Sequence, residues 1–184
     1  MVVAGSGATS LTVMTSAGGL TTARDYRAAE SLLSGPAAGV AGLADVARRL
    51  ELGAVIGFDM GGTSTDVARF DGDFDYRFEH RVGDAHIAMP ALAIETVAAG
   101  GGSICAQRDD RLRVGPESAG ADPGPACYGA GGPLTLTDVN LLLGRLDPER
   151  FTIPIDPVAA RRAFDGLATE SGVEGDDRRA CLLY

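Results

Sequence analysis

Gly57-Phe58-Asp59-Met60-Gly61-Gly62-Thr63-Ser64-Thr65-Asp66-Val67 is the stretch of sequence that decides the fold. The apolar run 54–58 predicts a β-strand that ends on an acidic residue, and residues 66–70 predict a second extended segment. The two glycines between them let backbone N–H groups approach an anion without a Cβ in the way. The stretch therefore predicts two strands joined by a loop that is suited to a phosphate group.

The residue types in this loop suit a nucleotide phosphate accompanied by Mg²⁺. We expect Asp59 to hold the metal directly or through water, and Asp59 and Asp66 to be the catalytic carboxylates. The cofactor-binding residues would be Gly61, Gly62, Thr63, Ser64 and Thr65. The alternative is an ordinary hairpin in which Asp59 only forms the turn.

A second glycine run, Gly100-Gly101-Gly102-Ser103, follows the apolar residues 91–97. Its backbone N–H groups could also face a nucleotide or a substrate, so these four residues join the predicted cofactor-binding set. The alternative for this run is a flexible linker.

The remaining chain predicts alternating short elements with turns between them. Helices are expected at 24–33, at 36–50 after a cap-like Ser34, at 137–144 with Thr137 as the cap, and at 157–172. The turn at 71–73 is expected to pair residues 74–81 with the strand before it. Further expectations are a strand at 9–14, a strand or short helix at 91–97, a brief strand at 112–114 and an ordered irregular loop at 116–133. The expected buried stripe of the helix at 36–50 is Val40, Leu43, Val46 and Leu50. The helix at 157–172 is expected because of the helical spacing of Val158, Ala159, Arg162, Ala163 and Leu167.

Three polar or reactive side chains keep two interpretations each. Asp138 and Asn140 follow a predicted helix start, so they either hydrogen-bond locally or contact a ligand. Cys127 lies in a loop rich in Gly and Pro and is either a small packing residue or a reactive thiol.

The composition of the chain excludes several kinds of binding partner and motif. Sixteen Lys+Arg against 25 Asp+Glu give a net charge of −9, so we expect neither nucleic-acid nor membrane binding. Every basic side chain is Arg, which removes the lysine of a Walker-type phosphate loop. Cys105, Cys127 and Cys181 form no paired motif, and this favours a cytoplasmic protein. Glycine contributes 26 of the 184 residues, about twice its usual share.

The loop 57–67 resembles the phosphate motif of the hydantoinase/5-oxoprolinase family. Other segments follow in the order that the family has: Ser34-Gly35-Pro36-Ala37-Ala38-Gly39-Val40, residues 96–104, residues 114–129 and Thr137-Asp138-Val139-Asn140. Together they cover the chain from about Met14 to Gly172.

This resemblance implies an α/β fold with a mixed sheet, as in the ribonuclease H-like lobes of actin-like and sugar-kinase-like ATPases. Residues 59–65 would be the second of two phosphate loops. Residues 1–172 would be a central, incomplete lobe, and 173–184 an unassigned tail. The implied partners are a missing N-terminal lobe and a hydantoinase B type subunit.

The activity implied by the resemblance is ATP-dependent opening of a cyclic amide such as 5-oxoproline or a hydantoin, with ATP and Mg²⁺ as cofactors. One alternative is a subunit of an acetone or acetophenone carboxylase. Another is a truncated lobe without catalytic activity.

Overall fold

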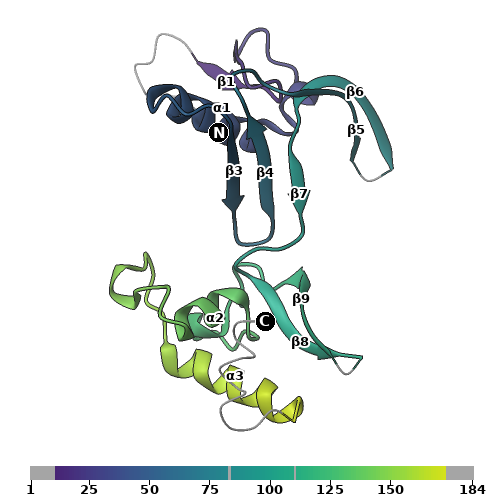
Figure 1. The fold of residues 1–184 in the computed structure, drawn as a ribbon. Coiled ribbons are helices and arrows are strands. Elements are labelled where there is room, and N and C mark those ends of the chain that lie inside the picture. Colours follow the sequence, from purple (N-terminus) through teal and green to yellow (C-terminus); the bar gives the residue numbers. More distant parts are fainter. Residues whose placement is uncertain (1–10, 83, 110, 173–184) are drawn as a thin grey trace. The chain divides into compact units, whose positions relative to one another are not determined.

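The computed structural model describes residues 11–82, 84–109 and 111–172. These residues form two compact units (Figure 1). Unit 1 consists of residues 11–59 and 66–96, and unit 2 of residues 60–65 and 97–172. The expectation of one lobe over 1–172 stays a prediction, and the expected tail, 173–184, lies outside the described residues. No helix in the described ranges is long and apolar enough to cross a membrane.

Unit 1 is built from one long helix and several short strands. Its elements are β1 (Thr12–Met14), β2 (Leu20–Thr22), a 3-10 helix (Ala28–Ser31), α1 (Ser34–Arg49), β3 (Val55–Met60), β4 (Thr65–Phe70), β5 (Tyr76–Val82), β6 (Ala85–Leu92) and β7 (Glu95–Val97). β1 and β2 form an antiparallel hairpin. β3, β4 and β7 form a sheet with β4 in the middle.

The core of unit 1 lies where small residues of α1 meet the strands. Ala37, Ala44 and Ala47 are at most 1% exposed, and they pack together with Ala68, Phe70 and Leu92. The predicted buried stripe was right for Val40 but wrong for Val46 and Leu50, which are 51% and 64% exposed. The alanine side is the buried one because short side chains let the helix backbone come close to the sheet.

Two expectations near α1 were wrong. Residues 24–33 form only the four-residue 3-10 helix, with a turn at 23–25 before it. Ser34 is the first helical residue and not the cap, a position taken by Leu33 without a side-chain hydrogen bond. The Leu33 N–H instead donates to Ser16 Oγ at 3.0 Å, so a hydroxyl from the turn after β1 serves the start of this helix.

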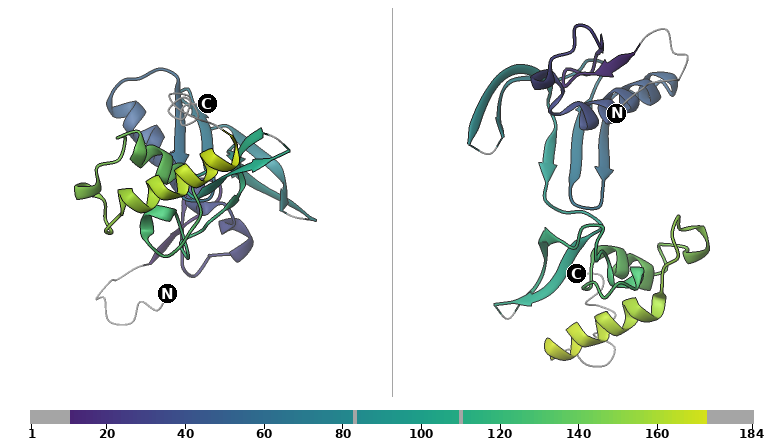
Figure 2. Two further views of the ribbon diagram at one scale, coloured as in Figure 1. Left: turned by 90° about the horizontal axis from the view of Figure 1, so that it is seen from below. Right: turned by 180° about the vertical axis from the view of Figure 1, so that it is seen from behind.

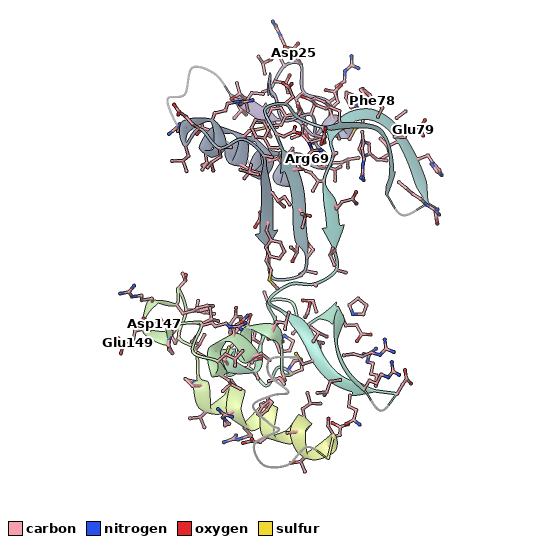
Figure 3. All side chains as sticks on the ribbon, viewed as in Figure 1. Asp25, Arg69, Phe78, Glu79, Asp147 and Glu149 are labelled. Carbon is pink, nitrogen blue, oxygen red and sulfur yellow. The ribbon has the colours of Figure 1, made fainter. Side chains whose placement is uncertain are left out.

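β5 and β6 form an antiparallel hairpin that extends as an arm (Figures 1 and 2). The expected pairing of residues 74–81 with the preceding strand was therefore wrong beyond one bridge, Phe70 to Phe74. β4 cannot pair with β5 because its two edges are taken by β3 and β7. Phe78 and Glu79 lie on this arm (Figure 3), and Phe78 is 66% exposed.

Unit 2 combines a hairpin with two helices. Its elements are β8 (Ser103–Arg108), β9 (Arg111–Ser118), a 3-10 helix (Ala126–Tyr128), α2 (Leu136–Leu142), a second 3-10 helix (Pro148–Arg150) and α3 (Pro157–Glu170). β8 and β9 pair antiparallel, so the brief strand expected at 112–114 is part of a longer one. The irregular loop expected at 116–133 begins only after Ser118.

The helices of unit 2 pack on each other around Cys127, Leu141 and Ala160. In α3 the buried residues are Ala160, Phe164 and Ala168, whereas Val158 is 65% exposed. The helix predicted at 157–172 is confirmed, and it ends at Glu170. Asp156 caps it through a 2.8 Å hydrogen bond from the Val158 N–H to its carboxylate.

Candidate functional site

Asp59 lies near the end of β3, on the side of the strand that faces α1. Its carboxylate comes within ordinary contact distance of α1 at Gly39, where a Cβ would lie 3.8 Å from Asp59 Oδ2. Asp59 and Asp66 line the same pocket of unit 1, about 340 Å³ in volume, together with apolar residues of α1 and β3. The two carboxylates that the sequence singled out are thus brought to one pocket.

The two carboxylates differ in how they are held. Asp66 Oδ1 accepts a 2.6 Å hydrogen bond from Thr96 Oγ1, which fixes it against β7. No hydrogen bond or ion pair is seen for Asp59 within residues 11–82, 84–109 and 111–172. An acceptor-only group without a partner is suited to a cation.

In unit 2 the loop Met60–Thr65 packs against the second glycine run. The Gly101 N–H donates to the Gly61 carbonyl at 2.9 Å, and the Gly102 N–H donates to the Gly62 carbonyl at 2.6 Å. A Cβ on Gly100 would lie 2.6 Å from the carbonyl carbon of Gly62. The glycine run is therefore a packed part of unit 2 and not a flexible linker. The expectation that its N–H groups face a nucleotide was wrong, because those of Gly101 and Gly102 donate to the loop and that of Gly100 donates to Ser103 Oγ.

This packing decides where the N–H groups of the loop point. The peptide bonds Gly61-Gly62 and Gly62-Thr63 are trans, so each N–H points opposite to the carbonyl of the same peptide unit. Because the two carbonyls accept from Gly101 and Gly102, the Gly62 and Thr63 N–H groups point away from those two donors, although a Cβ on Gly100 would lie 2.7 Å from the Thr63 nitrogen. Neither N–H donates a hydrogen bond within the described part of the chain. Successive unpaired backbone donors are suited to binding an anion.

The predicted hydroxyl residues divide into two kinds. Thr63 is exposed, so its hydroxyl is accessible to a ligand. Thr65 is 4% exposed and donates to the Ala99 carbonyl at 2.5 Å. Ser103 is fully buried, and its Oγ accepts the Gly100 N–H at 2.9 Å. Thr65 therefore joins the loop to the segment before the glycine run, whereas Ser103 stabilises the glycine run itself. Ser64 is half-buried.

A pocket of about 270 Å³ opens beside the loop in unit 2. It is lined by Met60, Gly61, Gly62, Gly101, Thr137, Asn140, Leu146 and Phe151. Asn140 Oδ1 accepts a 3.3 Å hydrogen bond from the guanidinium of Arg145. The pocket thus combines backbone and side-chain polar groups with an apolar wall, as ligand pockets do.

The structure decides between the two interpretations given for Asp138, Asn140 and Cys127. Asp138 is fully buried and accepts hydrogen bonds from the N–H groups of Ala126, Cys127 and Thr135 and from Thr135 Oγ1. Asp138 therefore binds the helix cap and also residues 126–127, whereas Asn140 lines the pocket. Burial and the neighbouring Asp138 raise the pKa of the Cys127 thiol to about 12, so Cys127 is a packing residue and not a reactive thiolate.

Sequence reasoning missed Thr137 as part of this site. Thr137 was expected to cap α2, but the cap is Thr135, whose N–H donates to the Asp138 carboxylate. The Thr-x-x-Asp spacing of Thr135 and Asp138 is the signal that could have located the cap. Thr137 is therefore inside the first turn, where its Oγ1 and its N–H both donate to the Gly101 carbonyl, at 2.9 and 2.8 Å.

The residues present are compatible with Mg²⁺ and a nucleotide. No group of three or more His, Cys, Asp or Glu side chains that could hold a metal is found among the described residues. Mg²⁺ does not require one, because it keeps several waters and takes one or two carboxylates plus phosphate oxygens. Asp59 is a carboxylate without a partner in unit 1, and the Gly62 and Thr63 N–H groups are donors without an acceptor in unit 2, among the described residues.

Comparison with known proteins gives a consistent set of likenesses. A family model described as hydantoinase/oxoprolinase matches residues 3–179. The chain is 60% identical over 137 residues to the 5-oxoprolinase PfmaA of Pestalotiopsis fici, a match that covers 72% of this chain and 10% of that protein. It is 47% identical over 131 residues to the caprolactamase subunit alpha of Pseudomonas jessenii, covering 65% of this chain and 18% of that one.

Two solved structures share the fold. A nucleotide-free acetone carboxylase superposes with a TM-score of 0.81 at 26% identity, and covers 95% of this chain. The crystal structure of the ATP-dependent caprolactamase from Pseudomonas jessenii superposes with a TM-score of 0.75 at 36% identity, and the match covers 92% of this chain. In both cases the chain spans 26% of the other protein. These likenesses confirm the predicted α/β fold class.

Proposed function

Since this chain belongs to the hydantoinase/oxoprolinase family, we propose that it is the phosphate-handling part of an ATP-dependent hydrolase that opens a cyclic amide. The relatives named 5-oxoprolinase and ATP-dependent caprolactamase support this reaction class. The chain spans 10% of the 5-oxoprolinase that it matches, so the activity is proposed for the whole polypeptide that carries the chain.

The observation that carries the proposal is the pair of unpaired N–H donors at Gly62 and Thr63. Both donors are held in place because the carbonyls of their own peptide units accept hydrogen bonds from Gly101 and Gly102. Donors fixed before the reaction stabilise developing charge without reorganising, which is the main contribution of a protein to phosphoryl transfer. We assign these two N–H groups to the phosphates of ATP.

In this proposal the two carboxylates have different roles. Asp59 holds Mg²⁺ directly or through a water molecule, and Asp66, fixed by Thr96, orients water in the same pocket. When bound, Mg²⁺ would neutralise charge on the transferring phosphoryl group. Asp59 precedes the first loop glycine, Gly61, by two residues in the sequence.

Phosphate chemistry is useful here because an unstrained amide is a poor electrophile. In the proposed reaction the lactam carbonyl oxygen takes the γ-phosphoryl group, and ADP leaves. One water adds to the carbonyl carbon, and the ring C–N bond breaks as the nitrogen leaves with a proton. A second water releases phosphate from the resulting acyl phosphate. The products are ADP, phosphate and the open-chain amino acid.

A second candidate is a subunit of an ATP-dependent ketone carboxylase. The likeness to acetone carboxylase, with a TM-score of 0.81, favours it. The identity of 26% is lower than the 36% to caprolactamase and the 60% to the 5-oxoprolinase. We therefore place the cyclic amide first.

The proposal also includes partners and location. The remainder of the polypeptide, including an N-terminal lobe with the first phosphate loop, and a hydantoinase B type subunit would complete the enzyme. The relative named caprolactamase subunit alpha supports an assembly of more than one subunit. A cytoplasmic location stays a prediction.

The test is phosphate release by the full-length protein with MgATP and each of 5-oxoproline, hydantoin, and acetone plus bicarbonate. We expect release with a cyclic amide and a loss of about 100-fold or more in Asp59→Asn, because the amide cannot replace a metal-binding carboxylate. Asp71→Asn is the matched control, since Asp71 is paired with Arg69 outside both pockets.

Two outcomes would count against the proposal. Release that depends on ketone and bicarbonate, but not on any amide, would replace it with the carboxylase. Unchanged phosphate release in Asp59→Asn would show that Asp59 does not bind the metal.

A further inference from the structure

Thr137 makes an unusual pair of contacts for a residue in the first turn of a helix. Its N–H and its Oγ1 both donate to one acceptor, the Gly101 carbonyl, at 2.8 and 2.9 Å. The N–H groups of a first helical turn have no partner inside the helix, so this N–H is available for the contact. The hydroxyl adds a second hydrogen bond that only Thr or Ser could make at this position.

The Gly101 carbonyl belongs to a peptide unit that contacts the phosphate loop directly. The N–H of the same unit is that of Gly102, and it donates to the Gly62 carbonyl at 2.6 Å. The peptide unit of that carbonyl carries the Thr63 N–H, one of the two unpaired donors. A continuous series of hydrogen bonds therefore runs from Thr137 through two peptide units to the Thr63 N–H.

The start of α2 is itself fixed, so Thr137 is not free to move. The buried Asp138 carboxylate binds the N–H and the hydroxyl of Thr135, the cap residue, and also the N–H of Cys127. These contacts hold α2 against the loop that precedes it. Thr137 then presents its two donors from a rigid support.

We infer that Thr137 is a positioning residue for the phosphate loop, which it orients through Gly101 and Gly102. This inference rests on the proposed function of the loop. Hydrogen bonds in series polarise one another, so two donors on the Gly101 carbonyl strengthen the Gly102 donor and hold the Gly62-Thr63 peptide in one orientation. The Thr63 N–H then meets the phosphate already aligned, which favours the transition state.

The test compares Thr137→Val with Thr137→Ser in the full-length protein. Valine keeps the shape of threonine and the backbone N–H but removes the hydroxyl, and serine keeps the hydroxyl. The first measurement is amide hydrogen exchange of Gly101 and Gly102 without nucleotide, with the thermal unfolding midpoint as a check on folding. We expect about tenfold less protection in Thr137→Val, the equivalent of one hydrogen bond, and protection within about twofold of wild type in Thr137→Ser.

The second measurement is the ATP kinetics of the same proteins. We expect kcat to fall about tenfold in Thr137→Val, with a smaller change in KM, and to recover in Thr137→Ser. A role in stability alone would leave kcat of the folded fraction unchanged.

The two measurements separate the possible failures. Unchanged exchange in Thr137→Val would overturn the inference while the proposed function stands. Altered exchange with unchanged kcat would also overturn it, because the contact would then be structural only. If wild type cleaves no ATP, the proposed function fails, and with it the positioning role, although the exchange result would still establish the hydrogen-bond series.

Discussion

Asp138 concentrates more hydrogen bonds on one side chain than any of its neighbours in the site. Its carboxylate accepts from the Ala126, Cys127 and Thr135 N–H groups and from Thr135 Oγ1, and it is fully buried. The donors come from two segments, the loop before α2 and the cap of α2. This one carboxylate thereby provides the acceptor for three buried backbone N–H groups.

Removing this carboxylate leaves buried donors without partners, which costs more than a lost surface contact. We expect Asp138→Ala to lower the free energy of unfolding by about 3 kcal/mol. Asp156→Ala is the matched control, because Asp156 is exposed, caps α3 with one hydrogen bond and should cost only about 1 kcal/mol. Chemical denaturation of both variants measures the difference, and equal losses would contradict a special role for Asp138.

Among the elements, the two glycine segments show how close backbone packing positions the loop of the candidate site. Gly100 and Gly102 approach the Met60–Thr65 loop so closely that a Cβ on either would come within 2.9 Å of the Gly62 backbone. Backbone cannot move aside as the end of a flexible side chain can. The close contact of these two segments therefore depends on the missing side chains.

We expect Gly100→Ala to destabilise the protein by about 1–3 kcal/mol, because the added methyl group must displace the loop. Gly166→Ala is the control, since Gly166 lies inside α3 and no atom beyond its own turn of helix is within 4 Å of the new Cβ. That variant should gain about 0.5–1 kcal/mol through helix propensity. If the loop packing is correct, the thermal unfolding midpoint falls in Gly100→Ala and rises in Gly166→Ala. Midpoint shifts of the same sign in both variants would contradict it.

The elements also show what sequence patterns could and could not predict. α1, β3, β4 and α3 were predicted because their periodicity or their flanking glycines and prolines are local signals. The pairing of β5 with β6 was not, because the turn at 71–73 gave no information that β4 would have both edges occupied. The buried face of α1 was misjudged because close packing selected alanine over the larger apolar residues.

The candidate site was predictable to a similar degree. The sequence identified both glycine segments, and unit 2 brings them into contact. It did not separate the hydroxyl groups that face a ligand from those of Thr65 and Ser103, which are used inside the turns. That division depends on which side of each turn is buried, a property of the tertiary contacts and not of residue type.

At the scale of the whole molecule, the chain corresponds to a small part of the proteins that it matches. It spans 10% of the 5-oxoprolinase that it matches and 26% of the caprolactamase. Ile56 and Phe58 of β3 are 73% and 70% exposed. An apolar strip of this kind is usual where further chain packs on a strand, which is consistent with the N-terminal lobe that we propose.

The most direct test of the central claim is a crystal structure of the full-length protein with Mg²⁺ and a non-hydrolysable ATP analogue. The account predicts phosphate oxygens within about 3.2 Å of the Gly62 and Thr63 nitrogens, and Mg²⁺ bound to Asp59 directly or through one water. A nucleotide bound elsewhere, with these two N–H groups facing only solvent, would contradict it.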